Sequence, residues 1–437
     1  MKKLGKKVFA FLLVYLGIVA LFSTLMIATY WLPNTNIRGH VAESVAQLEK
    51  EGIGYVPFFQ QTGATLDMHT DALMLNIALN KGMSEEQSTI ERAFENSFHE
   101  DESTVALSSL QENLADTSYN NHEYSRYWHG NQVIVRPLLL FFNYTEIRYL
   151  LMMMIFVLLA IVFGLIGKQL GIKHGIAFAI TITLMYIVLI PASLQYSTIF
   201  LVTLVGMIAV LLLYRYQKQK FMPILFFVIG AAATFFDLLT YPLVSLGLPL
   251  VLAVLLENRG GMNLRQQILF ILKLGILWAI GYSLLFFTKW VIASLVLHKD
   301  AISLALNEIL FRVNGNEKYP VNRLDVLANN INYFFVPTAK YVLAVLAIFW
   351  LIACLPYHSK PKQWKCILPL MCIAIVPYVW YILFAGHSAI HCWFTNKIQA
   401  MTLFALLCGM AEMIDETKLG SYRKKRRKEQ VKGEKKQ

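Results

Sequence analysis

The sequence predicts an all-α protein that crosses a membrane about ten times, and three observations lead to this fold class. Hydrophobic residues make up 57% of the 437 residues and charged residues only 15%, whereas a soluble domain carries about 25% charged residues. Apolar runs of about 20 residues, the length that crosses a bilayer, recur from one end of the chain to the other. Lys and Arg gather between alternate runs, as they do in the cytoplasmic loops of membrane proteins.

The first apolar run, 8–32, follows the basic start MKKLGKK and is too long for the core of a cleaved signal peptide. We therefore expect it to be an uncleaved first membrane span. The complete set of predicted spans is 8–32, 146–167, 174–193, 197–214, 221–237, 240–256, 268–297, 336–356, 366–385 and 395–414.

The loops after the even-numbered spans are basic: GKQLGIKH, RYQKQK, ENRGGMNLRQQ, YHSKPKQWK and the tail 415–437. The positive-inside rule assigns them, and both termini, to the cytoplasm. The net charge of +12 lies mainly in segments that flank spans, so we expect contact with anionic lipids rather than with nucleic acid.

The sequence thus divides into four parts. A basic N-terminus and first span (1–32) precede a large extracytoplasmic loop (33–145), and a multi-span domain (146–414, with an outer loop at 298–335) precedes the basic tail.

The large loop 33–145 is predicted to be mostly helical. VAESVAQLEK and DALMLNIALN have the spacing of short amphipathic or apolar helices. In SEEQSTIERAFENSF, Ser84 and Gln87 have the spacing of a capping box, with Glu85 and Glu86 in the first turn. The polar stretch 99–122 is expected to be mobile. The segment 124–149 mixes aromatic and basic residues with a short apolar run, which is typical of a segment at the membrane surface.

With this topology, many ionisable residues from distant loops face the outer side or the outer membrane edge. Charges near the hydrocarbon are costly and tend to mark function, so their gathering on one face is the strongest functional signal in the sequence. The residues are Asp67, His69, Asp71, Arg126, His129, Arg136, Asp237, Lys289, His298, Asp300, Arg312, Asp325, His387 and His391.

Asp67 and Asp71 are the candidates for a catalytic carboxylate. One of them can act as a general base, or both can bind a divalent cation together with His69, because D-x-H-x-D places all three on one side of an extended segment. The structural alternative makes Asp71 the N-cap of the following helix and Asp67 a turn residue with no helix of its own to cap.

Arg126, His129 and Arg136 are candidates for binding a phosphate at the membrane edge, whereas Trp128 is better explained as an interfacial anchor. Asp237 ends a predicted span and requires a polar partner, and it is a further candidate for binding the substrate.

His387 and His391 are four residues apart, on one face of a helix if the segment is helical. Phosphate or hydroxyl contact is the favoured function of this pair, and plain packing is a stronger explanation than zinc.

An outer cavity with these groups suits an amphipathic substrate such as a polyprenyl-phosphate sugar. A carboxylate would deprotonate the acceptor hydroxyl, which attacks the anomeric carbon, while Arg and His stabilise the departing phosphate.

This arrangement resembles the GT-C superfamily of integral-membrane glycosyltransferases, in particular its small bacterial members that use polyprenyl-phosphate sugars. The first helix, the large outer loop with its two acids, the short basic inner loops, and the segments RYWHGNQVIVRPLLLFFNY and GHSAIHCWFT carry the resemblance. It implies that Asp67 or Asp71 is the catalytic base and that Arg126, His129, His387 and His391 lie near the donor phosphate.

Many superfamily members carry their acidic pair closer to the first helix than this chain does. The chain also ends without a soluble domain of the oligosaccharyltransferase kind, so we expect transfer to a cell-surface glycan, teichoic acid or lipid. The alternatives are a lipid-linked glycan polymerase or ligase, a lipid-linked sugar transporter or flippase, which would be expected to show repeat symmetry, and a structural membrane partner.

Overall fold

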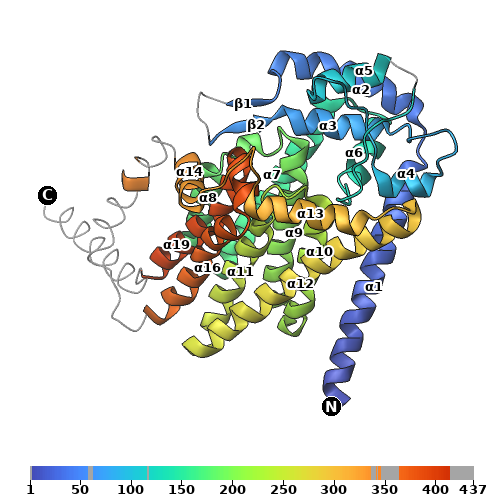
Figure 1. Cartoon of the computed structure of the whole chain (residues 1–437). Coiled ribbons are helices and arrows are strands. Elements are labelled where there is room, and N and C mark those ends of the chain that lie inside the picture. Colours follow the sequence, from blue (N-terminus) through green and yellow to red (C-terminus); the bar gives the residue numbers. More distant parts are fainter. Residues whose placement is uncertain are drawn as a thin grey trace, which may run out of the picture.

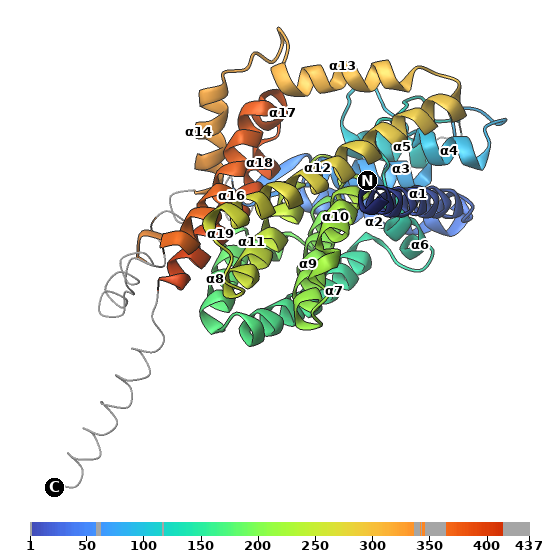
Figure 2. The same cartoon turned by 90° about the horizontal axis from the view of Figure 1, so that it is seen from below.

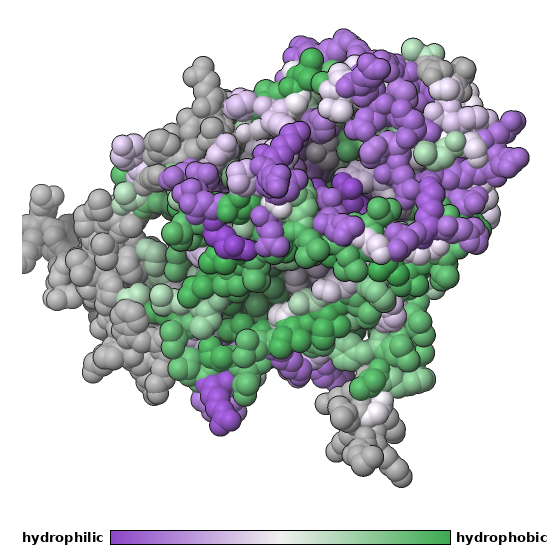
Figure 3. Space-filling model, in the orientation of Figure 1, coloured by the Kyte–Doolittle hydropathy of each residue, from purple (hydrophilic) through white to green (hydrophobic). Residues whose placement is uncertain are grey.

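The computed structural model describes residues 2–57, 63–115, 118–335, 341, 343–345 and 364–413. Over these residues the protein is almost entirely helical, which confirms the predicted all-α class. It has two layers: a polar layer of short helices covers one end of a bundle of longer helices (Figure 1). The face seen in Figure 3 follows the same division, because hydrophilic residues gather over the short helices and hydrophobic residues cover most of the bundle.

The polar layer contains most of the large loop predicted from the sequence. A short antiparallel pair of strands, β1 (Tyr55–Pro57) and β2 (Thr65–Asp67), places Tyr55 opposite Asp67. The elements of this layer are α2 (Asn34–Glu51), β1 (Tyr55–Pro57), β2 (Thr65–Asp67), α3 (Met68–Leu79), α4 (Thr89–Glu95), α5 (Ala106–Ala115) and α6 (Gln132–Leu139).

The bundle is built from longer, apolar helices. Capping boxes fix the starts of two of them: Asn143 with Glu146 at the start of α7, and Asn263 with Gln266 at the start of α12. The helices are α1 (Lys2–Tyr30), α7 (Tyr144–Gln169), α8 (Ile172–Leu184), α9 (Leu194–Arg215), α10 (Met222–Phe236), α11 (Leu243–Arg259), α12 (Leu264–Leu297), α16 (Trp364–Leu383) and α19 (Ala400–Glu412).

Two further groups of short elements complete the described chain. The segment after α12 forms α13 (Ala301–Asn314) and α14 (Arg323–Phe334), and the segment between α16 and α19 forms α17 (Ala385–Ile390), α18 (Cys392–Thr395) and the 3-10 turn η6 (Asn396–Gln399). Two 3-10 turns, η2 (Ile187–Leu189) and η3 (Gln219–Phe221), precede α9 and α10. In the view from below, α13 runs along one edge of the molecule beside α12 (Figure 2).

Five of the described helical segments are long and apolar enough to cross a membrane: Val8–Tyr30, Tyr144–Gln169, Leu194–Arg215, Gln219–Phe236 and Leu264–Leu297. The membrane-embedded character is thus supported, but the count of ten spans is not confirmed. Four other predicted spans coincide with α8, α11, α16 and α19, which do not meet that standard of length and apolarity. The predicted span 336–356 and the basic tail 415–437 lie largely or wholly outside the described residues.

The predicted helix start at Ser84 is wrong, because the capping box forms one turn later. The Ser88 hydroxyl accepts the N–H of Glu91 at 3.2 Å, and the Glu91 carboxylate accepts the N–H of Ser88 at 2.6 Å. Gln87 instead accepts the N–H of Met83 at 2.9 Å and donates to Glu95. Glu85 and Glu86 therefore lie in the turn before α4.

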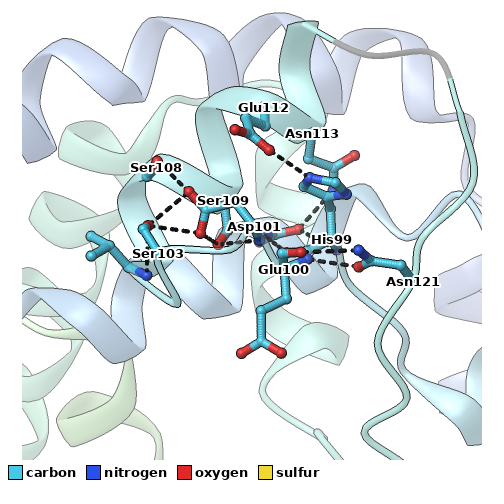
Figure 4. A network of polar contacts seen from close by, with 11 residues as sticks. His99, Glu100, Asp101, Ser103, Ser108, Ser109, Glu112, Asn113 and Asn121 are labelled. Atoms are coloured by element: carbon cyan, nitrogen blue, oxygen red, sulfur yellow. Dashed lines mark hydrogen bonds and ion pairs between the residues drawn. The ribbon is translucent and has the colours of Figure 1, made fainter.

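The stretch 99–122, expected to be mobile, is held by polar contacts in its described part (Figure 4). The Asp101 carboxylate accepts hydrogen bonds from the hydroxyls of Ser103, Ser108 and Ser109. The His99 imidazole lies 3.0 Å from the Glu112 carboxylate. These contacts fasten the start of α5 to the chain before it.

Trp128 is a core residue and not the expected interfacial anchor. Its side chain is fully buried, and its indole N–H donates to the carbonyl of Leu285 in α12 at 2.9 Å. The ring also packs against Phe94 and Phe235. Trp128 therefore joins the polar layer to α10 and α12.

Candidate functional site

Asp67 ends β2 and caps α3. Its Oδ1 accepts the N–H of Thr70 at 2.9 Å, and its Oδ2 accepts the indole N–H of Trp393 at 3.2 Å. The side chain is fully buried, and burial raises the pKa of the carboxyl to about 6, against the opposing effect of these hydrogen bonds and of Lys397. The expectation that Asp67 has no helix to cap is wrong, because α3 begins at Met68.

Asp71 caps a helix in the other layer. Its carboxylate accepts four hydrogen bonds: from the Tyr144 hydroxyl at 2.7 Å, the Ser193 hydroxyl at 2.9 Å, and the N–H groups of Leu194 and Gln195 at 2.9 and 3.2 Å. Burial raises its pKa to about 6, while the four donors oppose that change. Asp71 is therefore not the N-cap of its own helix; its negative charge lies at the N-terminus of α9, where the helix dipole favours it.

The candidate metal site formed by Asp67, His69 and Asp71 is not assembled in this structure. The extended strand ends at Asp67 and His69 lies inside α3, so the three side chains do not share one side of an extended segment. Asp67 contacts Trp393, whereas Asp71 contacts the start of α9. Across the described ranges, no group of three or more His, Cys, Asp or Glu side chains could hold a metal ion.

Arg136 has a structural position. Its guanidinium donates to the carbonyls of Thr29, Leu32 and Ala78 and to the Asn34 side chain. Burial lowers its pKa to about 10. It joins the end of α1 to α3 and does not line the cavity described below.

His129 is buried and uncharged. Its Nε2 lies 3.1 Å from the carbonyl of Tyr124, and its Nδ1 has no hydrogen-bond partner in the described part of the chain. Burial lowers its pKa to about 3, helped by the positive charges of Lys289 and Arg126. It lies near Arg126 but does not line the cavity either.

A cavity of about 320 Å³ lies where the segment before α6 meets α12 and α13. Most of its wall is apolar, and its charged groups are Arg126, Glu308 and Arg312. The full lining is Arg126, Tyr127, Leu239, Tyr282, Ser283, Phe286, Trp290, Ala305, Glu308, Ile309, Arg312 and Phe384. An apolar cavity with a few placed charges is the usual form of a site for an amphipathic ligand.

His387 and His391 hold Arg312 at the edge of this cavity. The Arg312 Nη1 lies 2.8 Å from the Nε2 of His391 and 3.4 Å from the Nδ1 of His387. The other His387 nitrogen lies 2.7 Å from the carbonyl of Leu239, so it carries the proton and leaves Nδ1 as an acceptor. Burial, with the positive charge of Arg312, lowers the pKa of His391 to about 3 and that of His387 well below its usual range.

The two histidines are therefore neutral acceptors that position a guanidinium. A carboxylate of Glu308, one helical turn away on α13, lies 2.8 Å from the Arg312 Nη2. The Arg312 Nε is buried without a hydrogen-bond partner among the described residues. Arg312, a residue of the cavity wall, thus has a buried donor that no described residue uses.

Asp237 shapes the turn that brings Leu239 to the same place. One carboxylate oxygen accepts the N–H of Thr240 at 2.9 Å, which supplies the polar partner expected from the sequence. The other oxygen and the Tyr282 hydroxyl are buried without partners in the part of the chain that is described. Leu239 has a left-handed backbone with a φ of 66°. Its carbonyl oxygen contacts His387, and the residue lines the cavity.

Asp67 is connected to the cavity through two aromatic side chains. Its partner Trp393 packs against the ring of His391 at a centroid distance of 5.1 Å, and His391 contacts Arg312. A series of contacts therefore links Asp67 to Arg312, which lines the same cavity as Arg126, and His387 links the Asp237 turn to Arg312. The structure places Asp71 and Arg136 in structural contacts.

The sequence analysis placed Arg312 among the outer ionisable residues but gave it no role of its own, and it did not identify Glu308 or Trp393. Glu308 and Arg312 lie four residues apart in ALNEILFRVN, a spacing that predicts an ion pair on one helix face. The ion pair of Glu308 and Arg312 could therefore have been predicted from the sequence. Nothing local marked Trp393, because its partner Asp67 lies more than three hundred residues earlier.

Comparison of the chain with protein-family models, with curated proteins and with solved structures finds no match.

Proposed function

We propose that the protein is a membrane glycosyltransferase of the GT-C type, which transfers a sugar from a polyprenyl-phosphate donor to a cell-surface glycan, teichoic acid or lipid. In this proposal both termini are cytoplasmic and the polar layer is extracytoplasmic. One observation carries it: an apolar cavity at the boundary of the polar layer and the bundle, with Arg126 and Arg312 in its wall.

The donor would be held by its phosphate. A guanidinium donates paired hydrogen bonds to phosphate oxygens, and Arg312 has a buried Nε without a partner in the described chain. The aromatic and aliphatic wall of Tyr282, Phe286 and Trp290 would take the first part of the polyprenyl chain. His387 and His391 would act as positioning residues, because they contact Arg312 and not the cavity itself.

Asp67 is the better candidate for the base. Asp71 has four donors on its carboxylate, whereas Asp67 has two. A base with a pKa of about 6 is ionised at neutral pH and still accepts a proton readily. In the reaction, Asp67 would take the hydroxyl proton of the acceptor, whose oxygen bonds to the anomeric carbon. The bond from that carbon to the phosphate oxygen breaks, and its electron pair leaves with the phosphate near Arg126 and Arg312.

The test is the sugar composition of surface glycans from cells that lack the protein, complemented with full-length variants present at equal membrane levels. We expect the wild type and Arg323→Gln, which alters an exposed arginine on α14, to restore one missing sugar. Asp67→Asn and Arg312→Gln should not restore it. Normal sugar composition with a collapse in glycan chain length would instead identify a polymerase or ligase. Full restoration by both Asp67→Asn and Arg312→Gln would overturn the assignment of the site.

A further inference from the structure

Tyr55 and Trp393 form an aromatic surface beside Asp67. The pairing of β1 with β2 places Tyr55 directly opposite Asp67, so the two side chains lie on the same face of the strand pair. The ring centroids of Tyr55 and Trp393 are 3.9 Å apart, and Trp393 donates its indole N–H to Asp67. The strand pair thus holds an aromatic ring over the Asp67–Trp393 contact.

The outer part of this surface is accessible. Tyr55 is 42% exposed, and Trp393 and His69 are half-buried. The His69 ring lies 5.7 Å from that of Tyr55. Within the described ranges, neither the Tyr55 hydroxyl nor a His69 ring nitrogen has a hydrogen-bond partner. Aromatic faces with free polar groups at their edges are therefore available to a ligand that has both kinds of surface.

His391 contacts both the aromatic surface and a residue of the cavity wall. One side of this ring packs near Trp393, and its Nε2 contacts Arg312 at the cavity. A ligand on Tyr55 would therefore approach Asp67 from the polar layer, separately from a ligand in the apolar cavity.

We propose that Tyr55, Trp393 and His69 form a saccharide-binding subsite, and that the acceptor of the proposed transferase is therefore a glycan and not a lipid. A pyranose ring has an apolar face of C–H groups, which packs on an aromatic ring, and hydroxyls at its edge, which bond to carboxylate, imidazole and phenol groups. The role of the bound saccharide as acceptor rests on the proposed function, whereas saccharide binding itself does not.

The test uses the full-length protein in lipid nanodiscs, probed with an array of bacterial surface oligosaccharides. We expect the wild type to bind at least one saccharide of the array. Tyr55→Phe keeps the ring but loses the hydroxyl and should retain most of that binding, whereas Tyr55→Leu keeps bulk without the ring and should weaken it about fivefold to tenfold. The matched control is Tyr119→Leu, because Tyr119 is 44% exposed on the same layer. His69→Ala provides a second variant at a different wall of the subsite, with a loss of binding expected.

Two results would overturn the subsite: no saccharide bound by the wild type, or equal binding by the wild type, Tyr55→Leu and His69→Ala. Arg312→Gln separates this inference from the proposed function. If Arg312→Gln stops sugar transfer but keeps saccharide binding, both proposals are supported. If saccharides bind through Tyr55 while no transfer is found, the subsite stands and the transferase proposal fails. If transfer occurs but its acceptor KM is the same in Tyr55→Leu, the subsite fails alone.

Discussion

Replacing Asp67 by Asn should stabilise the protein while it abolishes activity. The buried carboxyl has its pKa raised from 3.8 to about 6, which means that the folded protein holds the protonated form more tightly than the unfolded chain does. A difference of about 2 pH units corresponds to roughly 3 kcal/mol. The ionised Asp67 therefore lowers the free energy of unfolding by about that amount above pH 6.

The sign of the pH dependence follows from these two values. Below pH 3.8 the carboxyl is protonated in both states, and the wild type has the full stability that this group allows. As the pH rises through about 6, the folded state must carry a buried charge and that stability is lost. Asn resembles the protonated acid and does not ionise, so the advantage of Asp67→Asn should appear between pH 4 and pH 6 and be complete at pH 8.

The assay is thermal unfolding of the detergent-solubilised full chain at pH 4.5 and pH 8, with activity measured in parallel. We expect Asp67→Asn to raise the Tm by several degrees at pH 8, with a much smaller difference at pH 4.5, and to lower sugar transfer by a factor of about 100 or more. Asp101→Asn is the control with the opposite sign, because hydrogen bonds from serine hydroxyls lower the pKa of Asp101 and its charge is stabilising. A Tm for Asp67→Asn that is below the wild type at both pH values would refute the reasoning.

Three further predictions concern the contacts around the site. Asp71→Ala removes the acceptor for four donors, so it should lower the free energy of unfolding by about 3–5 kcal/mol; a change under 1 kcal/mol in denaturant unfolding would contradict its capping role. Arg136→Met should destabilise by about 3 kcal/mol because it leaves buried carbonyls without donors. An unchanged midpoint would show that water replaces the guanidinium. His391→Phe keeps the ring packing on Phe394 but removes the acceptor for Arg312, so it should raise the KM for a polyprenyl-phosphate donor about fivefold and leave saccharide binding unchanged. A loss of saccharide binding alone would show that His391 belongs to the acceptor side.

Hydropathy and charge predicted the features that depend on local sequence. Long apolar runs form α1, α7, α9 and α12. In lipid no water is available to the backbone N–H and C=O groups, and a helix satisfies them within the segment. The helix α4 was predicted as an element but not at its start. Both Ser84 with Gln87 and Ser88 with Glu91 fit the capping pattern, and in the structure Gln87 bonds to Met83 and Glu95 instead of capping a helix.

The site was predicted in its composition but not in its connections. The sequence indicated that outer acids, arginines and histidines would gather, and Asp67, Arg126, His387 and His391 do lie around one region. It offered a capping role for Asp71 but did not identify the helix that Asp71 caps. Asp71 is held by Ser193 and Leu194 of a helix start far along the chain, and that pairing has no local signal.

The apolar cavity and the aromatic surface belong to different layers, so in the proposed reaction the lipid-linked donor and the glycan acceptor approach from different sides. The cavity wall is apolar, and α13 beside it exposes Leu304 and Leu310, which are each 60% exposed and suited to lipid. The aromatic surface at Tyr55 belongs instead to the polar layer. If transfer occurs here, an amphipathic donor would enter from the bilayer and a glycan would arrive from the solution. The donor would then not have to pass through water, and the glycan would not have to pass through the bilayer, so the active site needs no large opening in either layer.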